Sequence, residues 1–244
     1  MSYQLQYADI IVRAAKLLPR FQTLAGMVPY EAKGILNSEI LFMAACTPEL
    51  FKGNIIESGR ARGQSTLILS LLFPESVIKS IEYESNSPDV SVAAKRLEKQ
   101  TNVELLFGDS EVMLEPIVQS GDIVLIDGPK MFRAVRLAIR LLATQKPIAV
   151  FIHDITVDSF ERKFLNRFFP EAYFSDSRVF AEAVISSDAE AESKQSPHTR
   201  LSGFTGAYGY GFSLAYIPFV TGRYYTILLL ISYAYDIASR IARL

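Results

Sequence analysis

Short apolar segments alternate regularly with helical stretches from residue 53 onward, and this alternation restricts the fold more than any other feature of the chain. The apolar segments cover residues 54–57, 77–83, 103–107, 122–127 and 147–153, and the helical stretches lie near residues 64–73, 88–100, 110–119, 131–143 and 158–168. Continuous apolar strands separated by helices predict a parallel sheet covered on both faces. Right-handed crossovers then give a doubly wound, Rossmann-like α/β domain, with its site at the carboxyl ends of the strands.

A loop with two glycines follows the first predicted strand. Glu57 ends the apolar run, Gly59 and Gly63 form the turn, and a helix is predicted from Gln64. Such a turn places backbone N–H groups beside a polar or anionic ligand at the helix N-terminus. A dinucleotide fingerprint would require glycine at position 61, where this chain has Ala61, and at position 64. The loop therefore predicts a nucleotide-like ligand other than NAD, with a simple strand-to-helix turn as the alternative.

Composition limits the partners and the compartment. The 244 residues suffice for one domain with a full core, and the net charge of −1, without a long basic run, disfavours bulk nucleic acid as a partner. The lone Cys46 excludes an internal disulfide and favours a reducing compartment. The N-terminus lacks the basic start and apolar run of a signal peptide. We therefore expect a cytoplasmic protein.

The chain before residue 50 predicts helices. Apolar residues of the stretch 6–18 have helical spacing, and Asn37 or Ser38 can cap a second helix that ends at Cys46. Breaks are expected between them, at Pro19, Gly26, Pro29 and Gly34. We interpret the chain as a single domain, with a helical cap (residues 1–50), a core (51–220) and a C-terminal helix (221–244). The cap either covers the substrate side or only packs on the sheet.

The later part of the core predicts a polar loop and a hairpin. Residues 185–203 are polar, small and interrupted by Pro and Gly, which is typical of a mobile loop. A strand over residues 211–217 is expected to run antiparallel beside a strand at about 172–180. This pair completes a predicted seven-stranded sheet with a final antiparallel strand.

The C-terminal segment, residues 223–244, predicts a helix that is apolar on most of its surface. Its densest apolar stretch, Tyr224 to Tyr235, is too short and too interrupted by polar residues to span a bilayer, which needs about 20 apolar residues. More than one side of such a helix must be covered. A second copy of the chain is favoured, which predicts a homodimer. Burial against the N-terminal helices and contact with a membrane surface are the alternatives.

Polar motifs follow the strands in an order that resembles class I S-adenosylmethionine (SAM) dependent methyltransferases, over about residues 50–182. Glu57-x-Gly59-x-x-x-Gly63 resembles their first motif, whose loop wraps the amino-acid end of SAM. Glu82 matches their ribose-binding acid, with Glu84 as a substitute, and Asp109 and Ser110 match the residues that meet adenine or cap the next helix. The resemblance implies SAM as cofactor and a binding set of Glu57, Gly59, Arg60, Gly63, Ser65, Thr66, Glu82, Asp109, Ser110 and Asp127.

The fourth strand ends in Asp127-Gly-Pro-Lys130, which resembles the Asp-x-x-Lys of catechol and caffeoyl-CoA O-methyltransferases. The resemblance implies that Asp127 ligates a divalent metal and that Lys130 takes a proton from the substrate hydroxyl. A lysine has a pKa of about 10.4, so a basic role requires burial or a nearby cation to lower it. Mg²⁺ would supply that cation and acidify the hydroxyl. The alternative for Lys130 is a solvated side chain at the start of a helix.

The fifth strand ends in His153-Asp154-Ile155. Asp154 falls where the metal-dependent enzymes have the Asp of an Asp-Asn pair, but Ile155 replaces the Asn. His153-Asp154 also resembles the ending of the macrocin O-methyltransferase and cephalosporin hydroxylase-like group. Asp127 and Asp154 with waters are the predicted Mg²⁺ ligands. His153 is the alternative base, and a hydrogen-bonded structural role is its other interpretation.

These resemblances imply a SAM-dependent methyltransferase that acts on a hydroxyl of a small molecule. A hydroxylase-like or sugar-directed member of the superfamily is one alternative. A SAM-binding or scaffold protein without turnover is another, suggested by Ile155 and by Gln145-Lys-Pro147, which stands where a Gly-Gly pair is usual. The sequence does not name the methyl acceptor.

Overall fold

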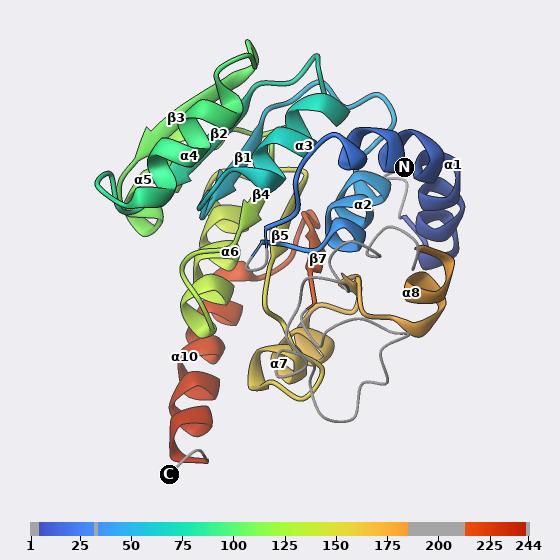
Figure 1. The fold of residues 1–244 in the computed structure, drawn as a ribbon. Coiled ribbons are helices and arrows are strands. Elements are labelled where there is room, and N and C mark those ends of the chain that lie inside the picture. Colours follow the sequence, from blue (N-terminus) through green and yellow to red (C-terminus); the bar gives the residue numbers. More distant parts are fainter. Residues whose placement is uncertain (1–4, 32–33, 185–212, 243–244) are drawn as a thin grey trace.

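A computed structural model describes residues 5–31, 34–184 and 213–242. The predicted polar loop at 185–203 lies outside these ranges, as do the first two residues of the predicted strand 211–217. Figure 1 shows a central sheet between two layers of helices.

The sheet has seven strands in the order β3-β2-β1-β4-β5-β7-β6. Five of them run parallel, namely β1 (Ile55–Ser58), β2 (Ile78–Glu82), β3 (Val103–Phe107), β4 (Ile123–Ile126) and β5 (Ala149–Ile152). β7 (Ala215–Pro218) lies antiparallel between β5 and the short β6 (Tyr173–Phe174). The predicted doubly wound sheet with a final antiparallel strand is confirmed.

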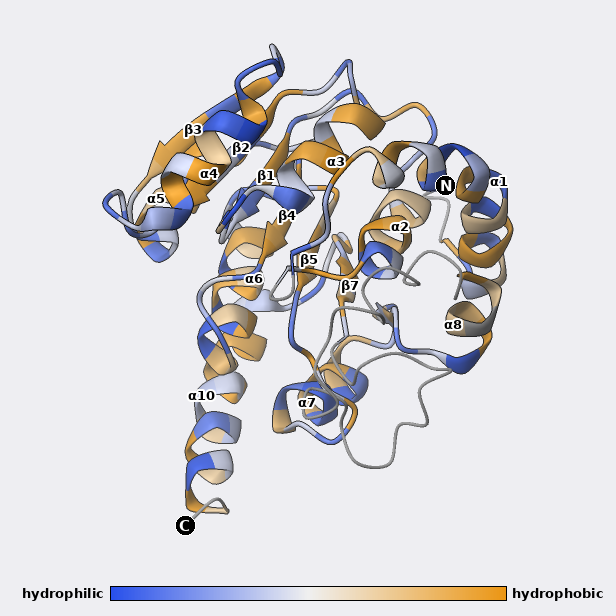
Figure 2. Ribbon diagram, viewed as in Figure 1, coloured by the Kyte–Doolittle hydropathy of each residue, from blue (hydrophilic) through white to orange (hydrophobic). Residues whose placement is uncertain are grey.

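Both faces of the sheet are apolar, because successive side chains of a strand point to opposite faces. On β4, Ile123 and Leu125 belong to one buried cluster, while Val124 and Ile126 belong to the other. Figure 2 shows the central strands coloured as hydrophobic. Such strands need helices on both sides, which explains why the period-2 pattern is missing from these strands in the sequence.

Two groups of helices cover the two faces. The first face carries α1 (Tyr7–Gly26), α2 (Asn37–Cys46), α3 (Gln64–Leu72) and α8 (Arg178–Val184), with α4 (Pro88–Leu97) beside α3. The second face carries α5 (Ser110–Ile117), α6 (Phe132–Thr144), α7 (Phe160–Phe168) and α10 (Tyr225–Ile241). In Figure 1, α6 and α10 run side by side, apart from α1 and α8. The N-terminal helices thus pack on the sheet.

Two sequence-based predictions about local structure are wrong. Pro19 does not break the first helix, since α1 continues through it to Gly26. Burial of Phe21 and Ala25 in the core stabilises the part of α1 beyond the proline. The predicted strand at 172–180 is paired only at Tyr173 and Phe174, and α8 follows it. Phe180 and Val184 are both buried at helical i, i+4 spacing, which favours a helix there.

The C-terminal helix α10 packs on α6 and α7 through one of its faces. Ser232 and Ser239 are buried on this face, and their small side chains allow a close approach to the neighbouring helix. Asp236 accepts a hydrogen bond from Arg136 of α6 at 2.8 Å. Among the described residues, no helix is long and apolar enough to cross a membrane.

Candidate functional site

The glycine loop between β1 and α3 has the backbone conformation that its sequence predicts. Gly59 has φ +94°, and a Cβ atom there would lie 3.1 Å from the carbonyl carbon of Asp127 and 3.2 Å from its Cβ. Gly63, with φ +74°, directly precedes α3. Only glycine combines such dihedrals with so close an approach to β4. The loop therefore brings the N-terminus of α3 beside the carboxyl ends of β1 and β4.

The carboxylate of Glu57 stabilises this loop and the helix that follows it. Its carboxylate is fully buried and accepts hydrogen bonds from the hydroxyls of Ser65 and Thr66 in α3 and from Ser80 Oγ of β2, the last at 2.7 Å. Burial raises the pKa of Glu57, and these hydroxyls oppose that effect. Three predicted cofactor residues, Glu57, Ser65 and Thr66, are thus brought together, and they hold α3 against the sheet.

Glu82, the predicted ribose acid, is tied to the same loop. Its Oε2 accepts a hydrogen bond from the backbone N–H of Ala61 at 2.7 Å, and its Oε1 accepts one from Tyr83 at 2.9 Å. A carboxylate oxygen has lone pairs for further donors. Both oxygens are thus oriented beside the loop with capacity for ligand hydroxyls.

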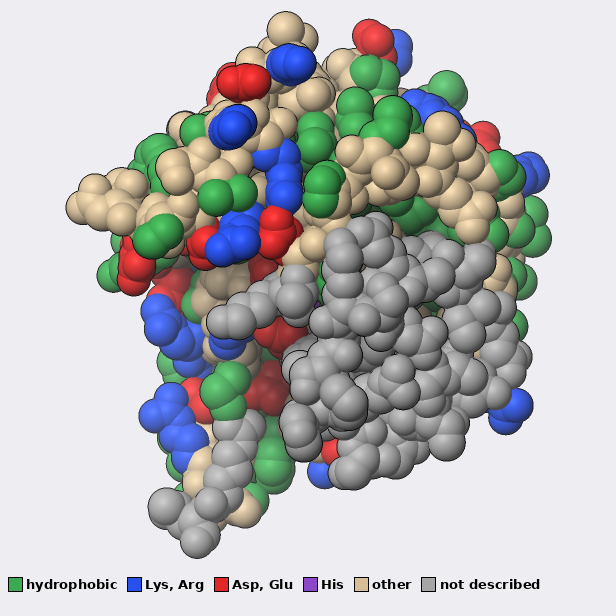
Figure 3. Space-filling view, in the orientation of Figure 1, with side chains coloured by type: hydrophobic (Ala, Val, Ile, Leu, Met, Phe, Trp, Pro, Cys, Tyr) green, Lys and Arg blue, Asp and Glu red, His purple; other side chains and the backbone are tan. Residues whose placement is uncertain are grey.

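A cavity of about 350 Å³ opens over the loop. Its lining residues come from the loop, from the segment before α2, from the start of α4 and from the end of β4, and they are Glu31, Gly34, Ile35, Gly59, Arg60, Ala61, Arg62, Gln64, Ser65, Asp89 and Asp127. The cavity size falls in the range of small-molecule sites. Figure 3 shows acidic and basic side chains beside one another on this face of the molecule.

The segment before α2 is held over the cavity by polar contacts. Glu31 forms ion pairs with Arg62 of the loop, at 3.3 Å, and with Arg96 of α4, at 2.5 Å. Gln64 Oε1 accepts a hydrogen bond from the backbone of Glu31 at 2.5 Å, and its Nε2 donates to Ile35 at 3.3 Å. The sequence analysis did not identify Glu31, Arg62 or Gln64 as site residues. Only the packing of α4 and the N-terminal segment on the loop brings them there.

The side chain of Arg60 extends across the carboxyl ends of β2 and β3. Its guanidinium is buried, donates to the carbonyls of Ser80 at 2.6 Å and Leu106 at 3.3 Å, and lies 4.8 Å from the ring centroid of Phe107. Its Nε and Nη2 have no hydrogen-bond partner among the described residues. Arg60 therefore bridges the carboxyl ends of β2 and β3.

The residues predicted to meet adenine also have structural contacts. Asp109 caps α5 by accepting a hydrogen bond from the backbone N–H of Glu111 at 2.9 Å. The Ser110 hydroxyl accepts a hydrogen bond from Ser58 Oγ at 2.7 Å, which joins the ends of β1 and β3. The helix-capping alternative for Asp109 is confirmed by this geometry, while contact with adenine stays a prediction.

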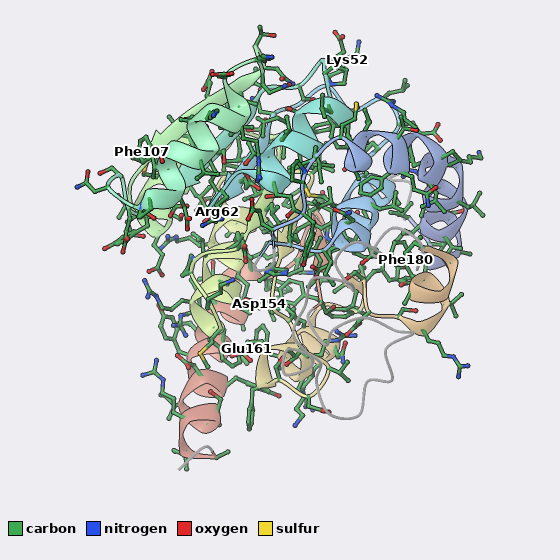
Figure 4. All side chains as sticks on the ribbon, in the orientation of Figure 1. Lys52, Arg62, Phe107, Asp154, Glu161 and Phe180 are labelled. Atoms are coloured by element: carbon green, nitrogen blue, oxygen red, sulfur yellow. The ribbon has the colours of Figure 1, made fainter. Side chains whose placement is uncertain are left out.

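A cluster of charged side chains lies where β4 and β5 end. The ammonium Nζ of Lys130 donates to Asp127 Oδ1 at 2.5 Å and to Asp154 Oδ2 at 2.6 Å. Asp154 has φ +63°, a left-handed conformation that Asp tolerates, at the turn that ends β5. Figure 4 labels Asp154 in this region, with Arg62 of the glycine loop on the same edge of the sheet.

His153 extends the cluster to α2. Its Nδ1 lies 2.6 Å from Asp127 Oδ1, and its Nε2 lies 3.2 Å from Oε2 of the buried Glu39. Burial favours the neutral ring, but the charges of Glu39 and Asp127 outweigh it and raise the pKa of His153 well above its usual value. The sequence analysis missed Glu39, which lies within the predicted second helix.

The same charges keep Lys130 protonated. Burial favours the neutral amine, but the Asp127 charge and the hydrogen bonds to Asp127 and Asp154 outweigh it and raise the pKa of Lys130. Asp127 has the opposite shift, because His153 and Lys130 overcome the effect of burial and lower its pKa. Both shifts favour the protonated form of the two predicted bases, Lys130 and His153, in this arrangement. Lowering of the lysine pKa, which a basic role requires, is not found.

The residues do not fit the Mg²⁺ site that the resemblance implies. Ligand atoms of Asp127, His153 and Asp154 lie within 4.8 Å of one another, which is close enough to surround an ion. However, Lys130 Nζ already contacts an oxygen of each carboxylate, and His153 Nδ1 contacts the same Asp127 oxygen. Ile155, at the position of the missing Asn, is buried in the core. The contacts of these ligand atoms therefore do not support the predicted Mg²⁺ site.

Comparisons with known proteins reveal a likeness of fold. No protein-family model matches the chain, and no curated protein matches its sequence. The structure is similar to class I SAM-dependent methyltransferases at low sequence identity. A Podospora anserina methyltransferase bound to SAH is 14% identical, with 90% of each chain covered and a TM-score of 0.44. Aeropyrum pernix fibrillarin with bound S-adenosyl-L-methionine is 13% identical, covering 84% of this chain and 76% of its own, with a TM-score of 0.40.

A third solved structure is the C-terminal domain of precorrin-6Y C5,15-methyltransferase from Rhodobacter capsulatus. It is 12% identical, with 63% of this chain and 81% of that chain covered and a TM-score of 0.47. The strand order with its antiparallel β7 is typical of the methyltransferase fold.

Proposed function

We propose that this chain binds SAM across the carboxyl ends of β1, β2 and β3 and transfers its methyl group to an oxygen of a small molecule. The observation that carries the proposal is the glycine loop, to which Glu82 is tied through Ala61 N–H, beside a cavity that reaches Asp127. Backbone N–H groups at the start of α3 suit the cofactor carboxylate. The Glu82 carboxylate suits the two ribose hydroxyls.

The charged groups that line the cavity support a ligand that carries both signs of charge. Glu31, Asp89 and Asp127 are acidic and Arg60 and Arg62 are basic, and Arg62 forms ion pairs with Glu31 and Asp89. SAM carries an ammonium, a sulfonium and a carboxylate, so its charges suit a mixed lining.

Methyl transfer on such a site depends mainly on alignment. The acceptor oxygen attacks the methyl carbon as the carbon–sulfur bond breaks, so SAH is released and the acceptor proton must leave. Asp127 lines the cavity and also belongs to the charged cluster, which supports an acceptor position near Lys130 and Asp154. With Lys130 and His153 held as cations, a carboxylate of the cluster or solvent must take the proton.

Two observations favour a second candidate function, a SAM-binding protein without turnover. The charges in the cluster favour the protonated form of both predicted bases, and Ile155 supplies no polar group to the cluster.

Calorimetry and a turnover assay test the proposal. We expect saturable binding of SAM and SAH, and no comparable binding of NAD⁺. SAH formation is then followed with phenols and sugars as acceptors. Failure to bind SAM would overturn the proposal, whereas binding without turnover on any acceptor would favour the binding protein.

We also propose that the chain pairs with a second copy of itself through α10. Its exposed face carries Ile227, Leu230, Ala234, Ile237 and Ile241, a 3-4 spacing in which the four large side chains are 53 to 66% exposed. This spacing is the pattern of a helix–helix seam. An antiparallel pair centred on Ala234 would keep the two Arg240 side chains about 18 Å apart, given a rise of about 1.5 Å per residue.

A further inference from the structure

The charged cluster at the ends of β4 and β5 has the shape of a metal site with an amino group in its centre. Lys130 Nζ lies 2.5 Å from Asp127 Oδ1 and 2.6 Å from Asp154 Oδ2. Magnesium bridging the same two oxygens would lie about 2.0–2.1 Å from each of them. The ammonium and the ion would therefore compete for one space between the two carboxylates.

The contacts of His153 also favour the ammonium as the occupant. His153 Nδ1 lies 2.6 Å from Asp127 Oδ1 and 3.3 Å from Asp154 Oδ1, so each carboxylate already faces two nitrogen groups. The third carboxylate, Glu39, lies 3.2 Å from the opposite ring nitrogen of His153. An ion in place of the ammonium would have to share the Asp127 oxygen that His153 Nδ1 already contacts.

We propose that the Lys130 ammonium takes the place of a divalent cation between Asp127 and Asp154, and that the protein does not use a metal ion at this position. An ammonium has three N–H donors, and the two carboxylates engage two of them. The Lys130 side chain is 49% exposed, so the third donor is accessible. In the proposed methyl transfer, the third N–H of Lys130 donates a hydrogen bond to the acceptor oxygen. This role of the third N–H rests on the proposed function.

The inference implies that removing the ammonium opens a metal site. In Lys130→Met, the methionine side chain has a similar length but no charge, so Asp127, Asp154 and His153 are left with their ligand atoms within 4.8 Å of one another. Lys130→Arg keeps the positive charge and serves as the matched control. Lys130→Met combined with Asp154→Asn removes one of the two carboxylates and should close the new site.

Titration with MnCl₂ alone, followed by the electron paramagnetic resonance signal of free Mn²⁺, tests the inference on the full chain without SAM. Lys130→Met should bind Mn²⁺ at least about tenfold more tightly than wild type and Lys130→Arg, since metal affinity depends on free, deprotonated ligands. The double variant should lose this gain. Thermal melts of each variant verify that it is folded.

Two outcomes would overturn the inference. Wild type that binds Mn²⁺ as tightly as Lys130→Met, with the binding lost in Asp154→Asn, would identify a metal centre from which the lysine is displaced. Lys130→Met without any gain would mean that the lysine is not what excludes the ion. SAM affinity is measured separately by calorimetry, so a failed metal prediction and a failed methyltransferase proposal give different results.

Discussion

The imidazole Nε2 of His153 lies 3.2 Å from Oε2 of Glu39, although 114 residues separate the two in the chain. Glu39 Oε2 also accepts a hydrogen bond from the backbone N–H of Leu36 at 2.9 Å, so one carboxylate caps α2 and faces the end of β5. The N-terminal helices, which pack on the sheet, thus also contribute a charge to the candidate site.

Replacing Glu39 by Gln should lower the pKa of His153 toward its usual value of about 6.5, because one of the negative charges beside the ring is removed. Nuclear magnetic resonance titration of the ring protons measures this shift. The chain has two histidines, so His198→Gln identifies the signal of His153. Glu49→Gln, at an exposed acid before β1, is the control and should leave that pKa unchanged.

The same substitution predicts how stability depends on pH. A histidine whose pKa is raised by folding stabilises the native state below its unfolded pKa, and this contribution is lost as the pH rises through the folded pKa. Glu39→Gln should therefore cost about 1–3 kcal/mol near pH 6, with a smaller difference at higher pH. Urea denaturation at several pH values would contradict this if the difference stayed constant.

Much of the fold and part of this site are predictable from the sequence. The strands and the glycine loop are predictable because local features of the sequence determine them. An apolar run that ends at Glu57 indicates a strand, and the glycines at 59 and 63 allow the turn that follows it. The Glu39–His153 contact is not, since only the packing of α2 on the sheet brings them together. The raised pKa of Lys130 depends on Asp127 and also on Asp154, and the second contact requires a left-handed backbone at the end of β5 that the sequence does not indicate.

Replacing Glu82 by Ala should weaken SAM binding by about 1.5–3 kcal/mol, the range for hydrogen bonds to a charged group. The carboxylate is oriented by Ala61 and Tyr83 backbone N–H groups toward the loop that lines the cavity. Calorimetry of Glu84→Ala is the control, because Glu84 lies two residues beyond on the same segment and is exposed. An equal loss in both variants would remove the specific assignment to Glu82.

Replacing Gly59 by Ala should destabilise the protein more than replacing Gly121 by Ala. Both glycines have a positive φ, +94° and +99°, so both substitutions introduce a left-handed alanine at about 1–2 kcal/mol. Only at Gly59 would the new Cβ meet the backbone of β4, at 3.1 Å, whereas nothing lies within 4 Å at Gly121. Equal midpoints of urea denaturation for the two variants would exclude the steric effect.

The contact between α6 and α10 should weaken in acid. Burial disfavours the charged form of Asp236, but hydrogen bonds from Arg240 and Arg136 outweigh it and lower its pKa. A carboxyl with a lowered pKa adds stability above its unfolded pKa, and this is lost as the pH falls through the folded pKa. Asp236→Asn should thus be less stable than wild type by up to about 1 kcal/mol at pH 7. The two should converge at strongly acidic pH, as monitored by thermal melts.

Replacing Leu230 by Glu should dissociate the proposed pair of chains. Leu230 is an exposed member of the 3-4 stripe of α10, and the opposite face of the helix, with Ser232 and Ser239, is buried against the second core cluster. A buried charge in a helix–helix seam is costly, whereas an exposed one on a monomer is not. Light scattering should give the mass of two chains for wild type and of one for Leu230→Glu.

Leu50→Glu is the matched control, because Leu50 is also an exposed leucine but is not part of α10. It should leave the mass of the wild-type pair unchanged. A wild type that is monomeric at all concentrations tested would contradict pairing. Flotation with anionic liposomes then tests whether the stripe binds a membrane surface. Liposome binding that is lost in Leu230→Glu and kept in Leu50→Glu would assign the stripe to a membrane surface, because an apolar helix face flanked by arginines is stable there.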